Sequence, residues 1–176
     1  MPAVILPFEG KSPIIHPSCF IAPLAAVSGD VVIGENSNVW FNCVVRGDVN
    51  EIRIGRDTNI QDGTVIHVAT HGQGSYIGDR VTVGHMALIH ACTVEDDAFV
   101  GMQACVMDGA KIESWAMVAA GSLVTPDKIV PSGQLWAGRP ARYVRDLNDE
   151  DRARMKWSWA HYVTLAQRHV QSIAGA

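Results

Sequence analysis

Branched aliphatic residues recur at every sixth position along most of this chain. Small residues commonly stand four positions later, and glycine often follows the aliphatic residue directly. A β-branched residue every six places suits a short strand that ends in a tight corner, and three such strands close a triangular coil of about eighteen residues. The pattern therefore predicts a mainly β protein, a parallel β-helix of hexapeptide repeats over residues 15–130. The predicted inward positions are Ile15, Ile21, Val27, Ile33, Val39, Val45, Ile54, Ile60, Ile66, Ile77, Val83, Ile89, Val94, Val100, Val106, Ile112, Val118 and Val124.

The C-terminal part of the chain follows a different pattern. Residues 125–147 contain three prolines and two glycines, which predicts an irregular connector. Asn148 precedes three acidic residues, a signal for the start of a helix. We expect an amphipathic helix over 148–176 that packs on the outside of the coil, in one structural domain with residues 1–147; docking to a partner or a membrane is the less favoured use of its apolar stripe. The stripe consists of Met155, Trp159, Tyr162, Ala166, Val170 and Ile173.

The composition fits a folded protein with a sizeable core. Among 176 residues, 48% are hydrophobic and 18% are charged, and the net charge is −4. The chain contains no cluster of lysine and arginine of the kind that binds nucleic acid. No apolar run is long enough for a membrane span, and no signal peptide is recognisable, so we expect a cytoplasmic protein. The cysteines lack CxxC spacing and are expected to be reduced thiols. They are Cys19, Cys43, Cys92 and Cys105.

Two of the seven histidines, His67 and His90, each follow an inward isoleucine and should point outward. They are 23 positions apart, of which a loop at residues 72–76 supplies five, and the remaining eighteen equal one coil. The two imidazoles should therefore lie about 4.8 Å apart on one face, where they can bind one metal ion. His85 lies around a corner and could reach that ion only from a neighbouring chain, which predicts a homotrimer with metal sites between subunits. Three unrelated surface histidines are the alternative.

Several short segments resemble the γ-class carbonic anhydrase family. They are residues 45–48 (VRGD), 59–63 (NIQDG), 66–67 (IH), 83–85 (VGH) and 89–90 (IH). Together with the hexapeptide coil and the terminal helix, the resemblance covers nearly the whole chain. It implies a left-handed β-helix, an exception to the usual right-handed crossover. It also implies a trimer with Zn²⁺, or in some members Fe²⁺ or Co²⁺, between subunits.

The resemblance assigns roles to individual residues. It implies that His67, His85 and His90 are the metal ligands. It further implies that Gln61 hydrogen-bonds and orients a metal-bound hydroxide, and that Asn59 lines the substrate pocket. The activity that follows is the reversible hydration of CO₂ to bicarbonate, since zinc held by three histidines lowers the pKa of its water to about 7.

Other matched residues have a structural reading as well as a catalytic one. The resemblance implies that Arg46 and Asp62 form an ion pair between subunits and that Asp48 belongs to the same network. Such pairs chiefly fix geometry and register, which is at least as good an account of them as catalysis. The chain departs from the catalytic members at residues 68–75, a short loop without the acidic proton shuttle. His71 in that loop is a candidate relay, with a mobile surface histidine as the plainer reading.

Two other functions remain open at this point. One is a hexapeptide acyltransferase or thioesterase-like enzyme acting on a CoA-linked substrate, which would use a histidine base and no metal triad. The other is a catalytically weak scaffold subunit, which would keep the ligands and lack the proton relay. The metal content of the purified protein distinguishes a metal-dependent carbonic anhydrase from the acyltransferase.

Overall fold

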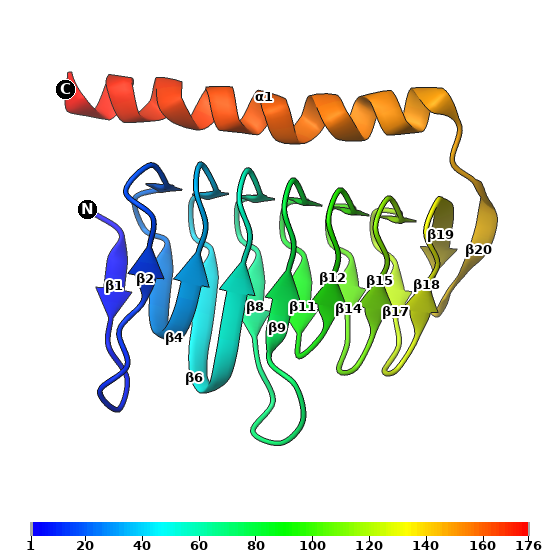
Figure 1. Cartoon of the computed structure of the whole chain (residues 1–176), viewed down its shortest axis with the longest axis horizontal. Coiled ribbons are helices and arrows are strands. Elements are labelled where there is room, and N and C mark those ends of the chain that lie inside the picture. The colour runs from blue at the N-terminus through cyan, green and yellow to red at the C-terminus, as the bar shows by residue number, and fades with distance from the viewer. Residues whose placement is uncertain (1, 176) are drawn as a thin grey trace.

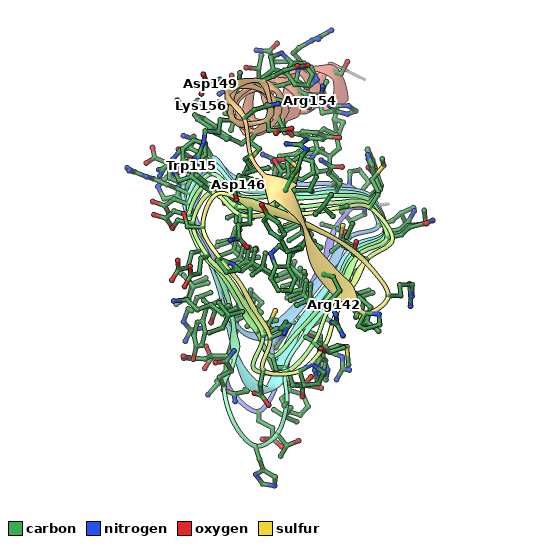
Figure 2. All side chains as sticks on the ribbon, turned by 90° about the vertical axis from the view of Figure 1, so that its right-hand side faces the viewer. Trp115, Arg142, Asp146, Asp149, Arg154 and Lys156 are labelled. Atoms are coloured by element: carbon green, nitrogen blue, oxygen red, sulfur yellow. The ribbon has the colours of Figure 1, made fainter. Side chains whose placement is uncertain are left out.

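The structure is a computed structural model that describes residues 2–175. Within these residues the chain forms twenty strands and then a single helix. The strands wind into a parallel solenoid whose cross-section is triangular, and the helix lies outside it along one face (Figure 1 and Figure 2). The predicted mainly β, parallel β-helix fold is confirmed.

The helix face is the sheet that carries the helix α1 (Asp149–Ala174) on its outer side. Its strands pair in parallel from one coil to the next, except for the last pair, which is antiparallel. They are β3 (Phe20–Ile21), β5 (Asn38–Val39), β7 (Asn59–Ile60), β10 (Thr82–Val83), β13 (Phe99–Val100), β16 (Met117–Val118), β19 (Gln134–Gly138) and β20 (Ala141–Asp146).

The other two faces form one continuous sheet, because β4 (Ala26–Ile33) and β6 (Val44–Ile54) each continue from one face to the next. Their first halves belong to the histidine face, together with β1 (Val4–Leu6), β8 (Val65–His67), β11 (Leu88–His90), β14 (Cys105–Val106) and β17 (Leu123–Val124). Their second halves belong to the third face, together with β2 (Ile14–Ile15), β9 (Ser75–Ile77), β12 (Thr93–Val94), β15 (Lys111–Ile112) and β18 (Ile129–Val130).

The solenoid interior is filled by the predicted aliphatic column. Sixteen of the eighteen predicted inward residues are less than 4% exposed. The two exceptions, Ile15 and Ile21, lie in the first coil and stay partly exposed. Burial of a β-branched side chain stabilises the fold by roughly 1.5–3 kcal/mol, so the repeated column is the main source of stability.

The prediction of an irregular connector over residues 125–147 is wrong. In that segment β18 and β19 continue the solenoid in register, with Lys111 opposite Ile129 and Met117 opposite Leu135, and β20 then folds back antiparallel on β19. The prolines do occupy turns and strand ends, where the missing N–H group removes no ladder hydrogen bond. The solenoid also begins earlier than predicted, since β1 pairs with β4.

The helix begins where the sequence predicts. Asn148 caps it, accepting a hydrogen bond from the Asp151 amide at 2.9 Å, and the Asp151 carboxylate accepts one from the Asn148 amide in return. From there α1 runs back along the helix face toward the N-terminal end (Figure 1). The docked stripe is shorter than predicted, because Val170 and Ile173 remain 50% and 49% exposed at the far end. In the described part of the chain, no helix has the length and apolar content to cross a bilayer.

The four cysteines carry free thiols, as predicted. Cys43 and Cys92 are fully buried, and burial raises the pKa of each thiol to about 12. They serve as small core residues at the coil corners.

Candidate functional site

Two imidazoles meet on the histidine face. His67 at the end of β8 and His90 at the end of β11 are direct partners in the parallel ladder, as the coil arithmetic predicts. His67 Nδ1 lies 3.3 Å from His90 Nε2, and the ring centroids are 5.2 Å apart. Both side chains still reach solvent, at 20% and 26% exposure. Two ring nitrogens therefore converge at an accessible surface.

The second nitrogen of each ring is bound to a carboxylate. His67 Nε2 lies 3.0 Å from Asp48 Oδ1, and His90 Nδ1 lies 2.6 Å from Asp108 Oδ1. A carboxylate behind an imidazole fixes its tautomer and orientation and makes the opposite nitrogen a better metal ligand. Burial alone would raise the pKa of Asp48, but the hydrogen bonds from His67 and from Arg46 lower it below its ordinary value, so this carboxylate stays ionised.

Gly47 holds this edge of the site in place. It stands between Arg46 and Asp48, at the point where β6 passes close to β4. A Cβ atom on Gly47 would lie 2.7 Å from the carbonyl oxygen of Asp30, which is closer than real Cβ atoms approach backbone. The absence of a side chain lets the two strands approach, and the residues on either side of Gly47 are thereby held next to His67.

The His67 and His90 pair fits two ligands of one metal ion. A tetrahedral ion with metal–nitrogen bonds of about 2.0–2.1 Å holds its ligand nitrogens about 3.3–3.4 Å apart, which matches the 3.3 Å separation here. Within residues 2–175 of one chain, no group of three histidine, cysteine or acidic side chains forms a metal site. One chain thus brings together two of the three predicted ligands.

The third predicted ligand, His85, lies at the other edge of the histidine face. It stands in the corner that precedes β11, five residues before His90. Its Nδ1 lies 2.9 Å from Asp62 Oδ2, and its Nε2 lies 3.4 Å from the hydroxyl of Tyr162 on α1. Burial, and then the nearby charge of Asp62, raise the pKa of Tyr162. This edge therefore pairs one imidazole with one carboxylate and one phenol.

Gln61 and Asn59 lie behind this second edge, beneath α1. Gln61 is 5% exposed and Asn59 is fully buried in the chain. Gln61 Nε2 donates to Asn59 Oδ1 at 3.0 Å, and Asn59 Nδ2 donates to Thr82 Oγ1 at 3.0 Å. Gln61 immediately precedes Asp62, the partner of His85, so the amide pair belongs to the His85 edge.

An apolar column separates the two edges. It is formed by the outward residues of successive strands of the histidine face, which pair in register. Two of them, Val65 and Leu88, are 36% and 37% exposed. A continuous apolar strip on a sheet face is typical of a protein interface. The column consists of Val44, Val65, Leu88, Cys105 and Leu123.

The loop after His67 is tied to its surroundings. Asn50 Nδ2 donates to the carbonyls of Ala69 and Gly72, each at 3.3 Å. Gln73 Nε2 donates to the carbonyl of Ala91 at 3.0 Å. This loop is the long connection between β8 and β9 in Figure 1. His71 is exposed on it and lines the same surface cleft as Asp108. A histidine thus lies near the His67 edge, where the expected acid is missing.

Sequence reasoning missed three contributors to these edges. Asp108 lies eighteen residues after His90, so the same coil arithmetic would have pointed to it. Tyr162 was assigned only to the apolar stripe of α1, and Thr82 was not singled out at all; both contacts depend on how the helix docks. In one chain, Arg46 pairs with Asp48 at one edge and Asp62 with His85 at the other. The predicted Arg46–Asp62 pair would have to form between chains.

Comparison with known proteins gives a consistent picture. The model of the bacterial transferase hexapeptide family (six repeats) matches residues 12–47. The chain is 53% identical to Gamma carbonic anhydrase 2, mitochondrial, of Arabidopsis thaliana over 90% of its own length and 59% of that protein. It is 42% identical to a carbonic anhydrase of Geobacillus kaustophilus, covering 93% of this chain and 90% of that protein. A crystal structure of a hexapeptide transferase family protein from Anaplasma phagocytophilum superposes with a TM-score of 0.90 at 46% identity, covering 93% and 96% of the two chains.

The chain spans about three fifths of the length of the Arabidopsis relative, and nearly all of the Geobacillus one. The Arabidopsis protein is named mitochondrial, so the cytoplasmic location of this chain stays a prediction. The extent of the match to the Geobacillus protein, together with the hexapeptide coil, decides the family. The chain belongs to the γ-class carbonic anhydrase family of hexapeptide-repeat proteins.

Proposed function

We propose that this protein is a metal-dependent carbonic anhydrase that interconverts CO₂ and bicarbonate at sites between the subunits of a homotrimer. The observation that carries the proposal is the division of the three histidines. Two ring nitrogens converge at one edge of the histidine face, and His85 lies at the opposite edge of the same face. Each edge is an incomplete site that an adjoining chain can complete.

A threefold arrangement joins the two kinds of edge. When three copies pack with their histidine faces toward a common axis, the His85 edge of one chain meets the His67 and His90 edge of the next. The apolar column through Val65 and Leu88 is then buried between chains, which accounts for its composition. The same contact would bring Arg46 and Asp62 from different chains together.

The residues at the joined edges suit CO₂ hydration. His67, His90 and the His85 of an adjoining chain would hold Zn²⁺, with Fe²⁺ or Co²⁺ as alternatives, and such an ion would make water a nucleophile at neutral pH by lowering its pKa to about 7. Asp48 and Asp108 hold the two imidazoles at one edge in the ligand orientation. Gln61 orients the reacting oxygen from the other edge. His71 is the candidate that passes the released proton to solvent.

The test combines metal analysis with stopped-flow CO₂ hydration. Protein purified without chelator should contain near one metal ion per chain and hydrate CO₂ above the buffer rate. The variants His85→Ala and His90→Ala should each lose metal alone and regain part of it when mixed and reassembled, because the intact edges come from different chains. A metal-free trimer with only background hydration would overturn the proposal. Transfer of an acyl group from CoA by such a trimer would favour the acyltransferase class.

A further inference from the structure

A chain of buried polar side chains runs beneath α1. Asn59 and Thr82 are partners in the parallel ladder of the helix face, and they are 0% and 1% exposed. Ser158 is 6% exposed and is the only polar side chain among the buried residues of the described helix. Thr82 Oγ1 lies 3.1 Å from Ser158 Oγ, so the helix takes part directly in the chain. Buried polar groups persist where their hydrogen bonds are satisfied, which gives this arrangement a fixed geometry.

The direction of the hydrogen bonds is set by a backbone carbonyl. Asn59 lies with one side-chain atom 3.2 Å from the carbonyl oxygen of Val81, which can only accept. The atom facing Val81 must therefore be the amide nitrogen of Asn59. The same nitrogen lies 3.0 Å from Thr82 Oγ1, and so the threonine hydroxyl accepts from Asn59 and has its own hydrogen free for Ser158. No amide flip at Asn59 satisfies these contacts equally.

The orientation passes from Asn59 to Gln61. Because the amide nitrogen of Asn59 is engaged with Val81 and Thr82, its Oδ1 faces Gln61 and must receive a donor. Gln61 Nε2 supplies that donor at 3.0 Å, which leaves Oε1 as the free end of the Gln61 amide. Within residues 2–175, Trp159 Nε1 is the only side-chain nitrogen or oxygen that is both fully buried and without a hydrogen-bond partner. The free Gln61 Oε1 is therefore not fully buried, and it still reaches solvent.

We propose that Thr82 and Ser158 are positioning residues that hold the Asn59 amide in the orientation set by the Val81 carbonyl, and through Asn59 lock the Gln61 amide with its oxygen turned toward the His85 edge. The inference rests on the proposed function, since it specifies how Gln61 acts there. An amide oxygen can only accept a hydrogen bond, so the group held by Gln61 must carry a hydrogen. A hydroxyl, on the nucleophile or on bicarbonate, meets that requirement. CO₂ carries no hydrogen and cannot occupy this bond.

The experiment removes the lock without touching the edge itself. Thr82→Val keeps the shape of the side chain and deletes the hydroxyl, Thr82→Ser restores the hydroxyl, and Ser158→Ala deletes the next link. Ser122→Ala is the matched control, because Ser122 is fully buried and its hydroxyl accepts a bond from the Gly138 amide outside the chain. Metal content and trimer mass are measured for every variant, since neither should change.

Thr82→Val should lower kcat/KM for CO₂ about two- to tenfold, the effect of losing one hydrogen bond. Thr82→Ser should restore the wild-type value, and Ser158→Ala should give a smaller loss of the same sign, while Ser122→Ala should leave kcat/KM unchanged. In a Gln61→Ala background the Thr82→Val loss should vanish, because the two residues act as one unit. Additive losses in the double variant would overturn the proposal.

A second readout does not depend on turnover. The side-chain amide hydrogens of Asn59 and Gln61 should exchange slowly with solvent in the wild type and faster in Thr82→Val, as followed by NMR. If Thr82→Val does not assemble, Ser158→Ala carries the same expectation. Equal exchange in the variants and the wild type would refute the lock. A wild-type trimer that binds metal and hydrates no CO₂ would refute the proposed activity, while the exchange rates would still decide whether the lock exists.

Discussion

Asp108 provides a test of whether the edge that carries His67 and His90 binds metal. Its Oδ1 accepts from His90 Nδ1 at 2.6 Å, a short contact for a hydrogen bond between an imidazole and a carboxylate. Replacing a carboxylate of this kind behind a metal-binding histidine typically weakens metal binding about 10- to 100-fold. The Asp108 side chain is 46% exposed in the single chain, so solvent screens part of its charge. Asp108→Asn keeps an acceptor oxygen and should weaken Zn²⁺ binding about tenfold, whereas Asp108→Ala should approach the upper end of the range.

The assay is competition for Zn²⁺ against a chromophoric chelator of known affinity, at one pH and with trimer mass verified. Asp127→Asn is the control, because Asp127 lines the same cleft and its loss removes the same charge without a contact to His90. We expect its Zn²⁺ affinity to stay within about twofold of the wild type, as for a screened surface charge. Equal losses in Asp108→Ala and Asp127→Asn would refute the orienting role and leave only a general effect of charge.

Three further predictions concern assembly, thiol reactivity and acid stability. Leu88→Asp should place a charge in the apolar column and give monomers by light scattering, whereas Ile129→Asp, at a 51% exposed site on the third face, should leave the assembly intact. Burial raises the pKa of Cys43 to about 12, so iodoacetamide at pH 8 should label it only after unfolding, and labelling of the folded protein by mass spectrometry would contradict its assignment to the core. Hydrogen bonds from Arg145 and from the helix cap lower the pKa of Asp151 from 3.8 to about 2. The stabilising effect of the Asp151 carboxylate should therefore be complete above pH 4 and be lost as the pH falls through 2. Asp151→Asn should flatten the acid unfolding transition in this window, as measured by circular dichroism.

The coil could be predicted from sequence because its signal is local and repeated. Each inward residue meets equivalent neighbours in the coils above and below, so the same choice of isoleucine or valine recurs. The stacking of His67 on His90 follows from the same repeat once the loop is subtracted. The strands after Pro126 were missed because prolines and glycines mark the corners, while the two-residue strands between them leave little pattern.

The supporting contacts could not be predicted in the same way. Asp108 is the exception, because it lies one coil after His90, the histidine that it contacts, and the coil arithmetic points to it. The bond between Thr82 and Ser158 joins residues 76 positions apart and exists only because α1 docks in one register on the helix face. Such contacts follow from the docked fold rather than from any segment of the chain, so sequence periodicity carries no trace of them.

The division between inward and outward residues explains how one coil can support different chemistry. The inward positions stabilise the solenoid and are interchangeable aliphatic residues, whereas the three histidines all lie outside the interior, on strand ends or corners. Substitution of His85 or His90 should therefore alter metal binding with little cost to the fold. A substitution in the apolar column should act differently. It need not alter any metal ligand, yet by preventing two chains from meeting it should abolish the proposed metal site between them. If the proposed trimer forms the sites, metal binding is coupled to association, and the metal affinity should fall at protein concentrations where the trimer dissociates.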